Sequence, residues 1–167
     1  MKIQILDRTK KKKFIEGLEE LGMKKILELL IRTGTERIRA YSGNLSNEEI
    51  MEIWRLLPIE GIGLYVGKEI MDRSGVREVR LSLDGMHLWK EQLTERVIVL
   101  TEEQEEEWFK GKDVELNETQ VGLISEGFVS VKSADGKDFV GTAKIGNGGK
   151  TLFGFLPKER RRKSQII

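Results

Sequence analysis

Cysteine is absent from the 167-residue sequence, and histidine occurs only once, at His87. Without cysteine the chain has no disulfide framework, no thiolate metal site and no cysteine nucleophile. A single histidine argues against a hydrolase triad and against a metal site built from histidines. We therefore expect a protein that holds no metal and no cofactor.

Long apolar runs are missing as well. No stretch approaches the roughly 18 residues that span a bilayer, and no signal-peptide pattern opens the sequence. We therefore expect a cytoplasmic protein that does not contact membranes. The length allows one large domain or two small ones, at roughly 100 to 200 residues per domain.

The net charge of +1 hides a strong segregation of charge along the sequence. Basic residues gather at Lys10–Lys13 and again at Lys158–Lys163, whereas Glu102–Glu107 is acidic. Local patches of this kind, more than net charge, attract polyanions. Lys10–Lys13 opens a predicted helix, where cations oppose the helix dipole, so a solvated face is the simpler interpretation of that cluster.

Hydrophobic periodicity predicts a mixture of helices and strands for residues 1–94. Ser46 is the predicted N-cap of a helix that ends before Pro58. Asp84-Gly85 is predicted to break the pattern before a short turn at Met86–Trp89. Three more strands are expected, at Lys2–Leu6, Gly61–Met71 and Val76–Leu83. Phe14, Leu18 and Leu21 predict a helical face. Lys24–Ile31 and Glu36–Tyr41 predict a hairpin, with a helix at Ile26–Ile31 as the alternative.

The pattern changes near Thr94, where we place the boundary between two domains, residues 1–94 and 95–167. Thr101 and Gln104 have the spacing of a capping box, which predicts a helix that ends at Gly111 and buries Trp108 and Phe109. A strand, a helix and several more strands within about 70 residues predict a small mixed barrel. The expected strands are Arg96–Leu100, Phe128–Lys132, Phe139–Ile145 and Thr151–Leu156.

The aromatic residues and the glycine-rich segments each allow two interpretations. Trp54, Trp89, Trp108 and the phenylalanines are predicted to be core residues, and an exposed stacking platform for single-stranded nucleic acid is the alternative. Gly146–Thr151 ends like a phosphate-binding loop, but the residues from Leu152 onward predict a strand where that motif needs a helix. The segment therefore does not predict nucleotide binding.

A series of short motifs in the second half of the sequence resembles a known RNA-binding family. These motifs are Gly127-Phe128-Val129, Asp135-Gly136, Val140-Gly141, Lys144, Gly149-Lys150 and Leu156-Pro157-Lys158 with Arg160 and Arg161. In this order they resemble the PUA-type RNA-binding region of bacterial rRNA cytosine-5 methyltransferases and its stand-alone archaeal relatives in ribosome biogenesis. Val97–Val114 and Gly63–Gly67 extend the resemblance, whereas residues 1–58 lie outside it.

The residue pattern alone predicts an N-terminal α/β domain, and the resemblance implies that a small PUA-like mixed β-barrel follows it. We therefore expect an α+β protein. A PUA module implies recognition of structured rRNA or tRNA along its first helix and neighbouring strands. That surface maps to Lys110, Lys112, Lys144, Lys158, Arg160, Arg161, Arg162 and Lys163. Arginines held by an ordered fold suit phosphate oxygens, and a solvated tail is the alternative for the terminal cations.

We therefore expect an RNA-binding accessory factor in rRNA processing, tRNA modification or ribosome biogenesis, and not an enzyme. A methyltransferase of the resembling family needs a cysteine and a methyl-donor domain, and this chain has neither. The alternative is a protein-protein adaptor that uses the acidic helix Thr101–Lys110 to bind an RNA methyltransferase or another maturation factor. An unrecognised enzyme that acts on RNA is the third hypothesis.

Overall fold

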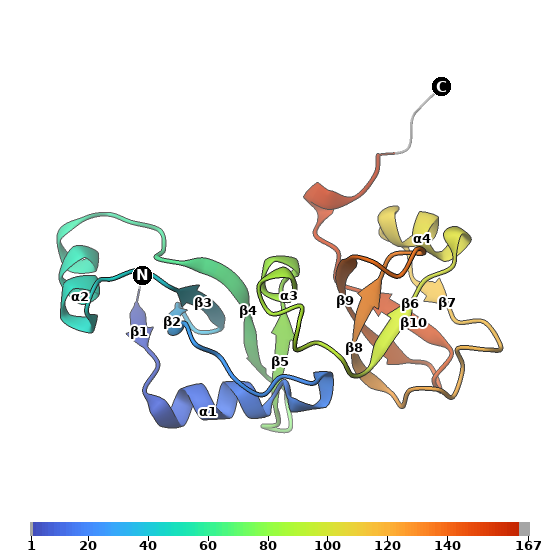
Figure 1. The fold of residues 1–167 in the computed structure, drawn as a ribbon, viewed down its shortest axis with the longest axis horizontal. Helices are drawn as coiled ribbons and strands as arrows, with labels where there is room; N and C mark the ends of the chain where they lie inside the picture. Colours follow the sequence, from blue (N-terminus) through green and yellow to red (C-terminus); the bar gives the residue numbers. More distant parts are fainter. Residues whose placement is uncertain (1, 164–167) are drawn as a thin grey trace. The chain divides into compact units, whose positions relative to one another are not determined.

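The computed structural model describes residues 2–163, which form an α+β protein with two separate sheets (Figure 1). The chain divides into two compact units, which we describe one at a time. Unit 1 comprises residues 2–19 and 23–85, and unit 2 comprises residues 20–22 and 86–163. The contacts thus group residues 86–94 with the second unit, and the domain boundary after Thr94 stays a prediction.

Unit 1 is built on a five-stranded antiparallel sheet whose spatial order follows the sequence, β1-β2-β3-β4-β5. The predicted hairpin is confirmed, although its first strand starts at Leu29 and not at Lys24. A register shift between Ile38 and Arg39 marks a bulge where β3 pairs with β4. The strands are β1 (Ile3–Ile5), β2 (Leu29–Thr33), β3 (Arg37–Tyr41), β4 (Leu64–Met71) and β5 (Arg77–Leu81).

Two helices cover different parts of this sheet. Asp7 caps α1 (Arg8–Glu16), which buries Phe14 and packs its C-terminal Gly17 against Val79 of β5. The predicted helical face is confirmed in part. Phe14, Leu18 and Leu21 are all buried, but α1 ends at Glu16, Leu18 lies in a turn, and Leu21 belongs to the short 3-10 helix η1 (Glu19–Leu21). α1 therefore covers the face of the sheet that carries Val79.

The other face of the sheet is covered at the β1–β2 end by α2 (Asn47–Leu56). Ser46 forms the predicted N-cap and completes a capping box with Glu49. Ile50 packs with Ile3 and Ile31, and the half-buried Trp54 lies against the same cluster. This confirms the predicted helix and its start.

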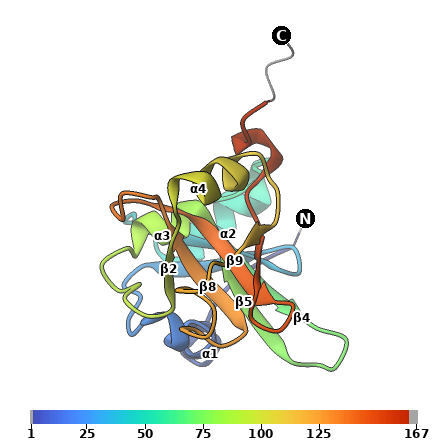
Figure 2. The same cartoon turned by 90° about the vertical axis from the view of Figure 1, so that its right-hand side faces the viewer.

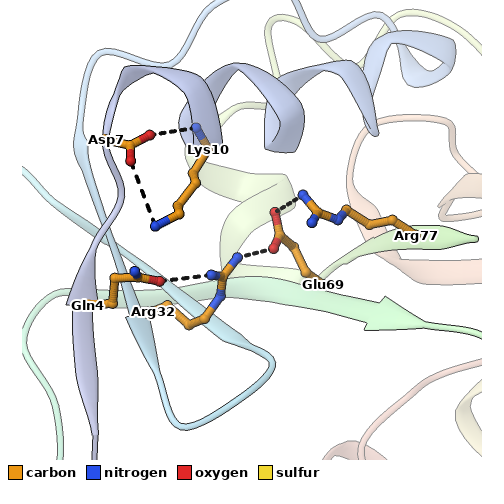
Figure 3. Close-up of polar contacts among 6 residues, drawn as sticks. All are labelled: Gln4, Asp7, Lys10, Arg32, Glu69 and Arg77. Carbon is orange, nitrogen blue, oxygen red and sulfur yellow. Dashed lines mark hydrogen bonds and ion pairs between the residues drawn. The ribbon is translucent and has the colours of Figure 1, made fainter. Parts of the chain in front are cut away.

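A buried carboxylate, Glu69 of β4, links strands of unit 1 on the α1 side of the sheet (Figure 3). Its side chain is only 6% exposed and pairs with Arg32 of β2. Arg77 lies 3.9 Å from the second carboxylate oxygen, and Arg32 also donates a hydrogen bond to Gln4. The sheet is thus joined by a polar chain that runs from β1 to β5.

The segment after β5 is a short helix, α3 (Leu83–Leu88), where the sequence predicted a break at Asp84-Gly85. That prediction is wrong because the Ser82 hydroxyl accepts a hydrogen bond from the Gly85 N–H and so supports the first turn. Gly85 also lies against the Val66 backbone, where a Cβ atom would collide. Its glycine serves close packing and not a turn.

Unit 2 is built on a second five-stranded sheet with the order β6-β8-β9-β10-β7. The paired strands β8 and β9 are labelled in Figure 2. β6 runs parallel to β8, and the other pairs are antiparallel. The predicted strands are confirmed, and the two-residue β7 is an addition that the sequence did not predict. The strands are β6 (Val97–Val99), β7 (Val114–Glu115), β8 (Gly127–Lys132), β9 (Phe139–Gly146) and β10 (Thr151–Gly154).

Trp108 is the centre of the unit 2 core. It lies on α4 (Glu102–Phe109), which begins at the predicted capping box of Thr101 and Gln104. The indole N–H donates to the Val140 carbonyl at 3.2 Å, and the ring lies on Gly141 and Gly154. A Cβ atom at either glycine would come within 2.8 or 2.7 Å of the ring, so both positions need glycine.

Within the described residues, no helix is long and apolar enough to cross a membrane.

Candidate nucleic-acid interface

The end of α4 brings two of the predicted RNA-binding residues onto one carboxylate. Lys110 Nζ lies 3.3 Å and Lys112 Nζ lies 3.1 Å from the Glu107 carboxylate. The hydrogen bond from Lys112, with a further contribution from Lys110, holds the pKa of Glu107 below its ordinary value. Glu107 therefore offsets part of the positive charge that a phosphate would meet here.

The chain end beyond β10 is tied to unit 2 as far as the structure describes it. After the 3-10 helix η2 (Lys158–Arg160), the backbone N–H of Arg162 donates to the Phe109 carbonyl at 2.7 Å. Arg161 Nε donates to the Leu156 carbonyl at 3.2 Å. The terminal cations up to Lys163 are thus presented by an ordered segment.

The three consecutive arginines of this segment have different surroundings. Arg160 is exposed, whereas the Arg161 side chain lies over Gly111 and is partly buried. The Arg162 guanidinium lies 4.8 Å from the centre of the Phe109 ring, within cation–π distance. Arg161 and Arg162 therefore hold the segment in place, although Arg162 is exposed, as are Lys158, Arg160 and Lys163.

Acidic side chains line the hollow beside Arg162, which has a volume of about 710 Å³. Phe109 lies in the same hollow, and Glu105 accepts a hydrogen bond from the Ala134 N–H at 2.6 Å. These carboxylates place negative charge next to Arg162, which disfavours a phosphate in the hollow. The acidic residues of the hollow are Glu102, Glu105, Glu106, Asp135 and Asp138.

A row of aromatic and basic side chains crosses three strands of the unit 2 sheet. Lys144 of β9 pairs with Phe128 of β8 on one side and with Phe153 of β10 on the other. Cross-strand partners project from the same face of a sheet, so the three side chains share one surface. Lys144 Nζ lies 5.2 Å from the centre of the Phe128 ring.

Phe155 extends this row past the end of β10. Its ring centre lies 6.0 Å from that of Phe128, with the two planes inclined by 46°. Phe153 is 38% exposed and Phe155 is 37% exposed, although both are large apolar side chains. We call Phe128, Lys144, Phe153 and Phe155 the Lys144 row.

The Lys144 row corrects the prediction that the phenylalanines are core residues. Phe14 and Phe139 are buried as predicted, but Phe153 and Phe155 alternate with the inward-facing Leu152 and Leu156 and so point outward. Apart from Gly154, every residue from Leu152 to Leu156 is apolar, so the sequence carries no alternation of polarity that could have shown this. Trp89 and Trp108 are buried as predicted.

The structure thus divides the predicted site residues into three groups. Lys144 lies within the aromatic row, Lys110 and Lys112 share Glu107, and the C-terminal cations lie on an ordered segment. Lys112 and Arg161 both line a small recess beside Gly111, which brings α4 and the chain end together. No group of three potential metal-ligating side chains occurs in residues 2–163.

None of the models of known protein families matches this chain, and no curated protein is significantly similar to it.

Proposed function

We propose that this protein binds structured RNA as an accessory factor in rRNA or tRNA maturation and catalyses no reaction itself. In this proposal unit 2 is a PUA-like module, unit 1 is the α/β domain that precedes it, and the protein acts in the cytoplasm. The arrangement of α4 between β6 and β7, and the curled mixed sheet around Trp108, support the PUA-like assignment.

The observation that carries the proposal is the Lys144 row. Bases of nucleic acids stack on exposed aromatic side chains, which contributes about 1–3 kcal/mol per base. A cation between the aromatic rings can contact a phosphate of the same strand, and Lys144 lies in that position. Exposed phenylalanines do not gain the free energy that burial of an apolar side chain provides. Their placement around a lysine therefore favours a ligand that has both aromatic rings and negative charge.

The test is a fluorescence-anisotropy titration of the full chain with labelled rRNA fragments and with an oligouridylate. Phe153→Ala is expected to weaken binding by about tenfold because it removes a stacking surface, and Lys144→Ala by a similar factor because it removes a phosphate ligand. Only the lysine variant should reduce the slope of log affinity against log salt concentration, by about the contribution of one neutralised phosphate.

Two exposed residues of unit 2 provide matched controls. Leu123→Ala removes a side chain that is 73% exposed, and Lys137→Ala removes a cation from the turn after β8. Both are expected to bind RNA like the unchanged protein. If Phe153→Ala and Lys144→Ala bind as tightly as these controls, the Lys144 row is not the RNA site.

The contacts of the chain end decide which variant of its cations is informative. Replacing Arg160, Arg161 and Arg162 together removes the bond to Leu156 and the interaction with Phe109, so effects on affinity and on stability would be mixed. Lys158→Ala with Lys163→Ala is the better variant because these side chains are exposed. It should weaken RNA binding with little change in melting temperature.

A protein-protein adaptor is the second candidate function, and the acidic hollow beside Arg162 is the observation that favours it. Carboxylates on α4 and on the turn after β8, together with Phe109, suit a basic segment of a partner protein. Such a partner, for example an RNA methyltransferase, would remain bound after ribonuclease treatment. Loss of that partner in Glu102→Lys, with RNA affinity unchanged, would support this role.

A further inference from the structure

Unit 1 has a second surface that combines cations with an aromatic ring, and none of its residues belongs to the predicted site. On the face of the sheet opposite α1, Arg37 of β3 pairs with Lys68 of β4, and Lys68 pairs with Arg80 of β5. Neighbouring strands lie about 4.8 Å apart, so these three side chains form a row about 10 Å long.

Tyr65 and Arg39 lie beside this row. They are cross-strand partners, because the bulge in β4 keeps Tyr65 on the same face as Lys68. Arg39 Nη1 donates to the Gly63 carbonyl at 3.0 Å, which fixes the guanidinium beside the ring. We call Arg37, Arg39, Tyr65, Lys68 and Arg80 the Tyr65 face.

The charges of this face act on the tyrosine itself. Burial raises the pKa of the Tyr65 hydroxyl, and the positive charges of Arg80, Arg37 and Arg39 act in the opposite direction. The strand pairing agrees with this, because Arg39 lies opposite Tyr65 while Arg37 and Arg80 flank Lys68 on the same face. Glu36 and Glu78 are the nearby acids: Glu36 acts on Tyr65, and Glu78 lies opposite Ile70 on the same face.

α1 and α2 do not cover the Tyr65 face, and α3 contacts β4 at the Val66 backbone through Gly85. α1 packs on the opposite face through Gly17 and Val79, and the Ile50 cluster of α2 covers the end with Ile3 and Ile31. Arg37 is exposed, and Tyr65, Lys68 and Arg80 are partly exposed.

We propose that the Tyr65 face is a second RNA-binding surface, which holds the phosphate backbone through its cations and one base or ribose against the tyrosine ring. Arginine suits phosphate because its planar group can donate two hydrogen bonds to one anion. Sheet faces with exposed aromatic rings are a common platform for unpaired bases. The inference rests on the proposed function in that both surfaces take the same RNA.

The test compares two double variants of the full chain in titrations with a fluorescein-labelled oligouridylate. Arg37→Ala with Lys68→Ala removes two cations of the Tyr65 face, and Arg8→Ala with Lys12→Ala removes two exposed cations of α1. The first pair is expected to lower affinity by about tenfold and to reduce the salt slope by about 0.7 for each phosphate that is no longer neutralised. The second pair should bind like the unchanged protein.

A tyrosine variant and a competitor distinguish RNA from other ligands. Tyr65→Leu should weaken binding without changing the salt slope, whereas Tyr65→Phe should bind like the unchanged protein, because stacking needs only the ring. Polyglutamate at equal charge concentration should compete poorly. If it competes as well as unlabelled oligouridylate, an acidic protein segment and not RNA is the occupant.

The remaining outcomes separate this inference from the proposed function. If Arg37→Ala with Lys68→Ala binds normally while Phe153→Ala and Lys144→Ala bind weakly, the inference is wrong and the proposed function stands. If Arg37→Ala with Lys68→Ala binds weakly while Phe153→Ala and Lys144→Ala bind normally, the Tyr65 face is an RNA-binding surface and the Lys144 row is not. If the unchanged protein binds no RNA even at low salt, both are wrong. Thermal unfolding of each variant excludes loss of structure as the cause.

Discussion

The two sheets carry open surfaces with opposite compositions. The Lys144 row of unit 2 has one cation among three phenylalanines, whereas the Tyr65 face of unit 1 has one aromatic ring among three arginines and a lysine. Stacking on aromatic rings is insensitive to salt, and phosphate contacts weaken steeply as salt rises. The comparison therefore predicts that the Lys144 row binds RNA mainly by stacking, and that the Tyr65 face binds the same RNA mainly by electrostatic contacts with phosphates.

Each unit has a carboxylate that lies between two cations, and the two carboxylates differ in their exposure to solvent. In unit 1, Glu69 is buried between Arg32 and Arg77, and in unit 2, Glu107 is 40% exposed between Lys110 and Lys112. A buried carboxylate has lost its contact with water and depends on a paired cation, while an exposed carboxylate only modulates the charge of its neighbours. The first contributes to folding, and the second adjusts the surface for a ligand.

The largest expected effect is that of Glu69→Ala on the stability of unit 1. Removing one partner of a buried ion pair leaves Arg32 without its countercharge, which costs about 3–5 kcal/mol. Urea unfolding followed by circular dichroism measures this loss. The double variant Glu69→Leu with Arg32→Met should recover much of it, because no buried charge remains. Equal losses in the single and double variants would show that the pair does not act as a unit.

Glu107→Gln is expected to have a smaller effect, and on affinity instead of stability. The substitution removes the charge that pairs with Lys110 and Lys112, so both cations become more available to phosphate. RNA affinity should rise by about threefold at low salt, and the salt slope should become steeper. Glu118→Gln, which neutralises an exposed carboxylate elsewhere in unit 2, is the control. Unchanged affinity in Glu107→Gln would place Lys110 and Lys112 outside the RNA contact.

The smallest expected effect concerns the two capping boxes under acid conditions. In α2 the Ser46 N–H donates to the Glu49 carboxylate at 2.7 Å, and this bond lowers the pKa of Glu49. In α4 the corresponding acceptor is the amide of Gln104, which does not titrate. A lowered pKa in the folded state means that the bond stabilises α2 above the unfolded pKa, about 4.3, and less as pH falls through the folded pKa.

This difference can be measured as the change in unfolding free energy between about pH 7 and about pH 3. The loss of stability on acidification should be smaller in Glu49→Gln than in the unchanged protein. Identical pH dependence in the two proteins would mean that the cap of α2 does not depend on the charge of Glu49.

The sequence predicted the elements whose signals are local. Ser46 and Thr101 each have a Glu or Gln three residues later, and both capping boxes formed because the bonds involve only neighbouring residues. The residue pattern of the strands was likewise sufficient to predict β8, β9 and β10. These features do not depend on where the rest of the chain lies.

The features that the sequence did not predict depend on distant neighbours. Gly85 looked like a breaker because the closeness of the Val66 backbone is not visible in the sequence. Phe153 and Phe155 looked like core because an apolar side chain reveals its face only once β9 and β10 are paired. The pairing of Arg37, Lys68 and Arg80 required the register of three strands.

The packing of Trp108 against Gly141 and Gly154 has a consequence for how the β9–β10 hairpin closes. A slip of β10 by one residue would turn Phe153 or Phe155 toward the indole, where even a methyl group does not fit. A shifted pairing would therefore cause a steric collision, so Trp108 sets the register of the hairpin.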